Sequence, residues 1–255
     1  MNAHRQIFVR LYLFVLCSLS FVPNALSSDK LQLEIKPADV GSLHINQPIW
    51  LNVKIHNTGS TSCTVLIEEV PDHGLQIVNF LGDIPFAKLL ERPRSIDFPL
   101  TPVNVKGNDA YGFNILLSDF VDVSKPGNFT LTLDLPVRST ADMSKRTHLR
   151  SDIQIQIGNP LDSSQYNALI RNSIDLFNTG NAEQKIKALK SLEILKPENL
   201  LILLKTGLTD KDEAVQLKAI QMLSSFDLLQ TKVLYSAALA SRYESVRNVA
   251  RDHLK

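Results

Sequence analysis

The sequence predicts a protein of two domains, an all-β domain built as an antiparallel β-sandwich and an all-α domain of short helical repeats. Three observations lead to this fold class. Apolar and polar residues alternate between residues 30 and 158, which is the period of half-buried strands. After residue 159 the apolar residues recur at helical spacing. Segments in this second part also resemble one another when they are shifted by 31 residues.

Residues 1–27 have the features of a secretory signal peptide. Arg5 and Arg10 precede an apolar run of about a dozen residues, and Ala25, Leu26 and Ser27 form a small-x-small cleavage pattern. The run is shorter than the roughly 20 apolar residues that span a bilayer. We therefore expect an exported protein, periplasmic or secreted, with no stable membrane insertion after the signal is cleaved.

Residues 28–158 form the predicted sandwich. The segments LQLEI, TLTLDLP and IQIQI alternate strictly, so their leucines and isoleucines are expected inside and their polar residues, Asp134 among them, outside. Turn residues separate about seven such strands, with no helical segment between them, which favours antiparallel pairing. The stretches QPIWLNVKIHNTGS and SKPGNFTLTLDLP resemble exported bacterial immunoglobulin-like modules. That resemblance implies an immunoglobulin-like sandwich and brings no functional residues with it.

Trp50 interrupts the alternation of its own strand. In IWLNVKIH the apolar set is Ile49, Leu51, Val53 and Ile55, which leaves the only tryptophan on the polar face. One interpretation is a strand that is covered on both faces near its end. The other is a contact surface, for the second domain or for a partner, because aromatic residues are enriched where a large apolar body meets a polar rim.

Residues 159–255 form the predicted helical domain, which follows the short linker Gly158-Asn159-Pro160. Asp162 or Ser163 is expected to cap the first helix. Two columns recur at the 31-residue period, one of alanines and one of leucines: Ala188, Ala219 and Ala250; Leu192, Leu223 and Leu254. Two helices per period describe a solenoid, and small residues allow helices to approach closely where they cross.

The segments DKDEAVQLKAIQML and SRYESVRNVARDHL resemble short HEAT-like repeats of the phycobilisome-lyase type. In the first copy Gln184 replaces the valine and the acidic turn is absent. The resemblance implies an α-solenoid of helix pairs whose stacked surface binds another macromolecule. No lyase residues can be carried over to this chain.

Basic residues share one face of the last helix. Arg247, Arg251 and Lys255 are spaced by four, and Lys185 lies two repeat periods before Arg247. One interpretation is the solvated face of a terminal cap. The other is a basic binding stripe. Together with Trp50, the candidate partner-binding residues are therefore Lys185, Arg247, Arg251 and Lys255.

Motifs for chemistry are absent from the sequence. The histidines after the signal segment have no metal-site spacing, and we expect each to be exposed or locally bonded. We expect no catalytic residue, metal or cofactor. The 27 basic and 26 acidic residues nearly cancel, which argues against a nucleic-acid partner. Cys63 is expected to be a small buried hydrophobe, with a reactive or intermolecular thiol as the alternative.

Three functions stay open at this point. The first is an exported, non-catalytic protein-interaction scaffold or accessory subunit of the cell envelope, bound to a protein partner. The second is a glycan- or peptide-binding sandwich that the helical repeats support. The third is a hydrolase with a site assembled from scattered acids and histidines.

Overall fold

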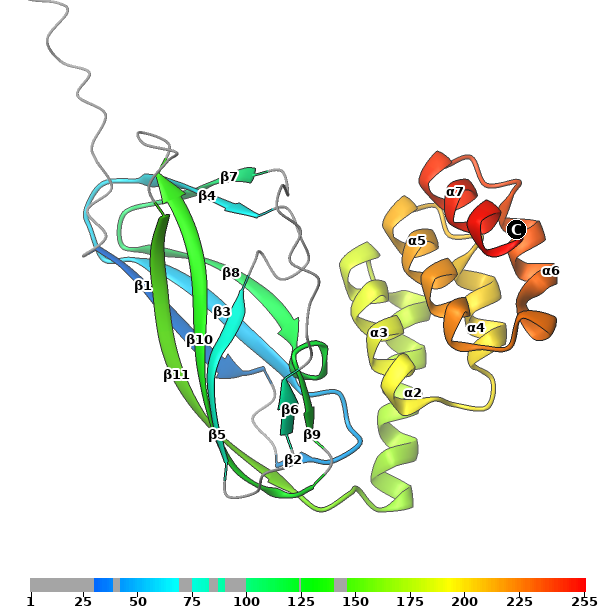
Figure 1. The fold of residues 1–255 in the computed structure, drawn as a ribbon, viewed down its shortest axis with the longest axis horizontal. Helices are drawn as coiled ribbons and strands as arrows, with labels where there is room; N and C mark the ends of the chain where they lie inside the picture. Colours follow the sequence, from blue (N-terminus) through cyan, green and yellow to red (C-terminus); the bar gives the residue numbers. More distant parts are fainter. Residues whose placement is uncertain are drawn as a thin grey trace, which may run out of the picture.

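The computed structural model describes residues 30–38, 42–68, 75–82, 87–89, 100–123, 125–139 and 146–255. The predicted signal segment, residues 1–27, lies outside them. A two-sheet β-sandwich is followed by a region of six helices, which confirms the predicted fold class (Figure 1). The chain passes from strand to helix between Gly158 and Ser163.

The first sheet has three antiparallel strands in the order β1-β3-β8. The second has six, in the order β2-β11-β10-β4-β7, with β5 also paired to β10. A further pair, β6-β9, lies beside them. The strand bounds are β1 Leu31–Pro37, β2 Leu43–His44, β3 Trp50–Asn57, β4 Cys63–Glu68, β5 Gln76–Gly82, β6 Ala87–Leu89, β7 Leu100–Val105, β8 Asp109–Leu116, β9 Val121–Val123, β10 Gly127–Ser139 and β11 Arg146–Gly158.

The sandwich core lies between the two sheets and contains the predicted alternating residues. Val53 of the first sheet and Leu133 of the second are fully buried in the same apolar cluster. The longest pairing joins β10 to β11 in antiparallel register, from Gly127 opposite Ile157 to Arg138 opposite Arg146. One pairing departs from the predicted antiparallel pattern, because the two-residue strand β2 runs parallel to the end of β11.

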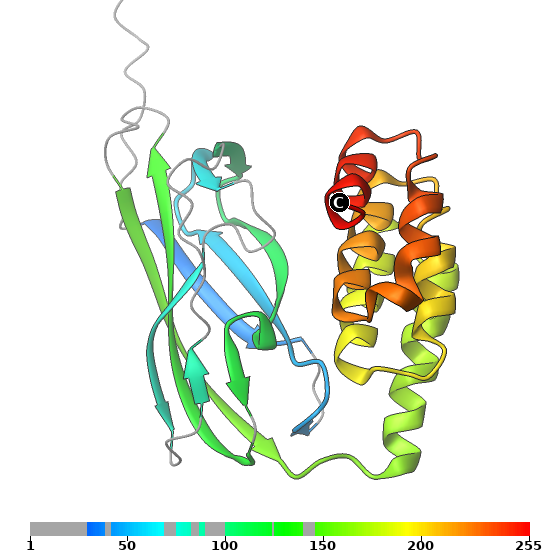
Figure 2. The same cartoon turned by 45° about the vertical axis from the view of Figure 1, so that its right-hand side comes forward.

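The helices form two rows, an inner row of α3, α5 and α7 and an outer row of α2, α4 and α6. Helix α2 packs on α3, α4 on α5 and α6 on α7, and α5 lies between α3 and α7 (Figures 1 and 2). Their bounds are α2 Ser163–Thr179, α3 Ala182–Leu195, α4 Leu200–Gly207, α5 Glu213–Met222, α6 Leu228–Ala238 and α7 Glu244–His253.

The helix starts explain part of the repeat pattern. Asp162 accepts a hydrogen bond from the Gln165 backbone and so caps α2, as one of the two predicted caps. Asn181 and Gln184 form the same reciprocal capping box at α3. Gln184 is therefore part of the cap of α3. The equivalent positions in the later copies are Val215 and Val246, which are buried. This local role accounts for the missing valine in the first copy.

The predicted alanine column is buried. Ala188, Ala219 and Ala250 have no exposed surface, and all three belong to one apolar cluster of the helical region. At the α4–α5 contact a side chain on Gly207 would have its Cβ 2.8 Å from the Cβ of Ala219. Small residues are therefore required at this crossing. The prediction of a continuous apolar seam with alanines at the helix contacts is confirmed.

Candidate functional site

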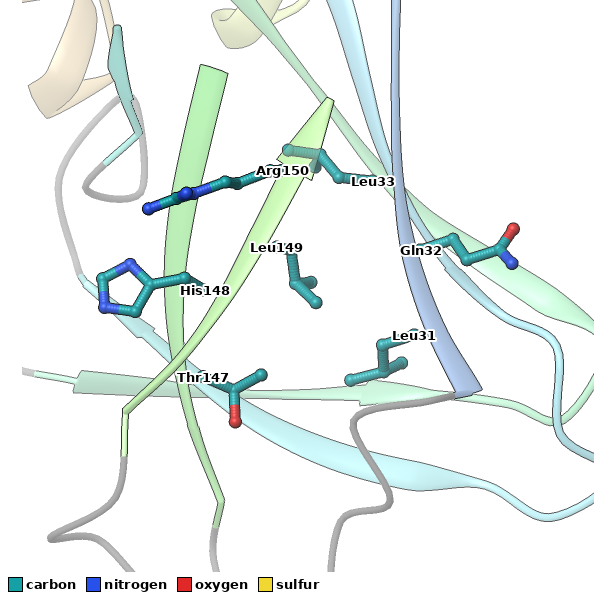
Figure 3. A pocket seen from close by; sticks show the side chains of 7 residues that line it. All are labelled: Leu31, Gln32, Leu33, Thr147, His148, Leu149 and Arg150. Carbon is teal, nitrogen blue, oxygen red and sulfur yellow. The ribbon is translucent and has the colours of Figure 1, made fainter. Parts of the chain in front are cut away.

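A hollow of about 500 Å³ lies on the sandwich between β1 and β11. Leu31, Leu33 and Leu149 lie between the two strands in Figure 3, and all three are buried in the core. Gln32 points away on one side, while His148 and Arg150 point away on the other. The three leucines expose little surface, so most of the accessible lining of the hollow is polar.

Asp134 of β10 is paired with Arg150 of β11 and is buried, with its side chain 4% exposed. The ring nitrogen Nδ1 of His148 lies 2.6 Å from its Oδ2 atom, and Nε of Arg150 donates to its Oδ1 atom at 2.9 Å. Asp134 lies on the side of its strand opposite the core leucines, as the alternation predicts, but its carboxylate is buried there, which the alternation does not predict. The buried charge is tolerated because a guanidinium and an imidazole each bind one of its oxygens.

Two other described histidines form hydrogen bonds to residues of other segments rather than to their own neighbours in the chain. The Nδ1 atom of His44 lies 2.7 Å from the carbonyl oxygen of Asn159, and Nε2 of His56 lies 2.6 Å from Glu34. Hydrogen bonds from Lys36 and then His56 lower the pKa of Glu34 from 4.5 to about 2. No group of three or more metal-ligating side chains occurs among the described residues.

Trp50 lies between the sandwich and the helices. Its indole Nε1 donates to Ser191 of α3 at 3.2 Å, and Nζ of Lys187 lies 5.1 Å from the ring centroid. A second link joins Lys190 of α3 to Asp119 at 2.8 Å. Trp50 is only 6% exposed, so its ring is buried by contacts within the chain. Little of its ring is left for an external partner.

Lys185 and Arg247 occupy equivalent positions in the repeat and contact the chain itself. Lys185 donates to Asp210 at 2.6 Å, and Arg247 donates to the carbonyl oxygen of Ser241 at 2.7 Å. Gln216, the residue between them in the column, bonds both loops, since it donates to the Asp210 carbonyl and accepts from the Ser241 hydroxyl. The column forms a ladder that connects successive loops. Partner binding by Lys185 and Arg247 stays a prediction.

The remaining two candidates are at the exposed end of α7. Arg251 donates to Asn248 of the same helix, and Lys255, just after the end of α7, donates to Asp252, each three positions away. The hydrogen bond from Lys255 lowers the pKa of Asp252. The structure thus brings Trp50 next to α3, links Lys185 and Arg247 to loops, and leaves Arg251 and Lys255 on the surface. It does not join the five residues into one site.

Apolar side chains also lie on the outer row of helices. Ile202 of α4 is 68% exposed and Val233 of α6 is 75% exposed, and the two are 31 positions apart. Leu229, one turn before Val233, is 86% exposed. This surface is not predicted above, because the alanine and leucine columns of the 31-residue period face inward. The signal was present, since Ile202 and Val233 obey the same 31-residue period.

None of the described helices has the length and apolar content of a membrane span.

Comparisons with known proteins leave the family open. No protein-family model matches the chain, and no curated protein is similar to it. Among solved structures, a PapD-like domain of human CEP192 has 8% identity and a TM-score of 0.26 over 51% of this chain and 87% of that one. A native alpha-2-macroglobulin fragment from Escherichia coli has 10% identity and a TM-score of 0.29 over 88% and 41%. These weak likenesses carry no functional argument.

Proposed function

We propose that this chain is an exported, non-catalytic protein-interaction protein, a scaffold or accessory subunit of the cell envelope. Export is proposed from the signal-like pattern of residues 1–27. The observation that supports the interaction role best is the exposed apolar surface on the outer helices, formed by Ile202, Leu229 and Val233. Large apolar side chains that stay exposed at repeated positions of an array are candidates for protein contacts.

We also propose that the six helices form a short HEAT-like array. The alternating packing of the helices, the buried alanine column and the ladder through Gln216 support this assignment. In such arrays equivalent positions line up along one side, so a residue exposed in one unit has a counterpart in the next. Ile202 and Val233 are such counterparts, and a partner lying along the outer row would meet both.

The proposal is tested by placing a photo-crosslinking residue at Val233 in the full chain, expressed in its native source. A discrete crosslinked partner is expected, and the second substitution Leu229→Glu should remove it. The control places the same crosslinker at Arg171, an exposed residue of α2. Equal crosslinking from both positions, or none from Val233, would contradict the proposal.

A second candidate function is a peptide- or glycan-binding sandwich with the helices as support. The hollow between β1 and β11 favours it, since its lining carries the polar side chains that orient a ligand by hydrogen bonds. Thr147→Trp should narrow the hollow and weaken binding of a peptide or oligosaccharide identified by a binding screen. Unchanged affinity in this variant would place the ligand elsewhere.

A further inference from the structure

The imidazole of His148 and the guanidinium of Arg150 lie side by side on the outer face of the second sheet. The two oxygens of the Asp134 carboxylate bind His148 and Arg150 separately. Since these oxygens belong to one planar group, the imidazole and the guanidinium must be neighbours. Both side chains extend in the same direction from β11 in Figure 3. A buried residue of one strand therefore fixes the orientation of two residues of the next.

Part of each side chain remains available to a ligand. Arg150 is 65% exposed and uses only Nε for Asp134, so its two terminal Nη groups have no hydrogen bond to any described residue. His148 is 47% exposed, and its Nε2 likewise has no partner in the described part of the chain. The free atoms are thus two guanidinium donors next to one ring nitrogen.

The surrounding charge has the sign that an anion requires. The pairing of β10 with β11 puts Arg138 opposite Arg146, four residues along from the Asp134–Arg150 pair and on the same face. On this face the three guanidinium groups of Arg138, Arg146 and Arg150 lie near two carboxylates, those of Asp134 and Asp152, which leaves one positive charge in excess even when His148 is neutral. Arg138 and Arg146 have contacts of their own within the chain and contribute here through their charge.

We propose that Arg150 and His148, oriented by Asp134, bind an oxyanion group: a carboxylate or a phosphate. The two Nη groups of Arg150 would donate to two of its oxygens, the geometry in which guanidinium binds carboxylate and phosphate best. With Nδ1–H donating to Asp134, Nε2 of the neutral ring is an acceptor and binds a protonated phosphate oxygen. Protonation of the ring turns Nε2 into a donor and strengthens binding of a carboxylate.

The chain offers variants that separate this role from a simple loss of charge. Arg150→Gln removes the Nη donors, and Arg150→Lys keeps the charge but not the two-pronged geometry. Arg171→Gln is the matched control, because Arg171 is an exposed arginine of α2, in the helical half. Asp134→Asn tests orientation, and its folding is checked separately since Asp134 is buried.

The experiment is an NMR titration of the full chain at constant ionic strength, following the Arg150 Nε–H and His148 ring signals. One arm adds sodium phosphate and the other an acetylated dipeptide with a free carboxylate. We expect saturable shifts in at least one arm, which identifies the source of the oxyanion. Affinity should fall about tenfold or more in Arg150→Gln, less in Arg150→Lys, and stay unchanged in Arg171→Gln. Shifts that do not saturate in either arm, or equal affinity in Arg150→Gln and the parent chain, would overturn the proposal.

Discussion

Trp50 of strand β3 and Ser191 of helix α3 are 141 positions apart in the chain and share a buried hydrogen bond of 3.2 Å. Lys187 lies over the indole ring, and the Asp119–Lys190 ion pair is a second contact. Together these contacts join the sandwich to helix α3. The two halves are thus connected by tertiary contacts in addition to the peptide chain. The contact has direct consequences for stability.

Ser191→Ala should lower the free energy of unfolding by about 1–3 kcal/mol, because it leaves the buried indole N–H without an acceptor. Urea denaturation of the full chain measures this change. Ser236→Ala is the control, since Ser236 is exposed on α6. In a Trp50→Phe background, which has no indole N–H, Ser191→Ala should cost much less. An equal cost in both backgrounds would show that the bond does not contribute.

Ala219→Leu should destabilise the helical region by about 1–3 kcal/mol, since a larger side chain would press against Gly207 at the α4–α5 contact. Circular dichroism at increasing urea concentration measures the effect. Ala237→Leu provides the control, because Ala237 is exposed on α6 and its substitution adds no buried volume. If both variants were equally stable, Ala219 would not be needed for close approach.

Glu34 should make the free energy of unfolding depend on pH. Its pKa falls from 4.5 to about 2 in the folded chain, chiefly through the hydrogen bond from Lys36 and then that from His56. The folded state therefore binds this proton less readily than the unfolded state, and the stabilisation is complete above pH 4.5 and is lost as the pH falls toward 2.

Glu34→Gln should accordingly be less stable than the parent chain above pH 4.5, with the difference shrinking as the pH falls toward 2. Thermal unfolding over this pH range is the measurement. Glu198→Gln, an exposed substitution at the start of α4, controls for the loss of one carboxylate. A constant difference across the range would contradict the assignment.

Cys63 should react slowly with thiol reagents in the folded chain. The residue is half-buried, and burial raises the pKa of its thiol above the ordinary 9.0, which reduces the thiolate fraction at any given pH. The rate of reaction with a disulfide reagent at mildly alkaline pH measures this effect, with the urea-unfolded chain as reference. A folded chain that reacts faster than the unfolded one would instead support the reactive-thiol alternative.

Periodicity was sufficient to predict the fold class but not the surroundings of single residues. The alternation in IQIQI predicts which side of β11 is buried, and Ile153, Ile155 and Ile157 are indeed in the core. The same rule puts Asp134 on the correct side of β10 but does not predict its burial, because its partners His148 and Arg150 are on another strand and come into reach only through the β10–β11 register. A pattern within one strand carries no information on that register.

The candidate binding residues show a similar limit. Trp50 was singled out because it interrupts an alternation, yet its contact with Ser191 depends on how the two halves pack. The 31-residue period grouped Lys185 with Arg247 correctly as equivalent positions, but a period does not tell which way a column faces. Both side chains turn toward loops of the same array.

The ladder also restricts how the helical half can change in length. The bond from Lys185 to Asp210 and the bond from Ser241 to Gln216 each span 25 positions, so the two are successive turns of one pattern. A single inserted residue in either loop would shift one partner out of phase with the other. Adding or removing a complete pair of helices would keep every bond in phase. We therefore expect natural length variants of this half to differ by whole helix pairs.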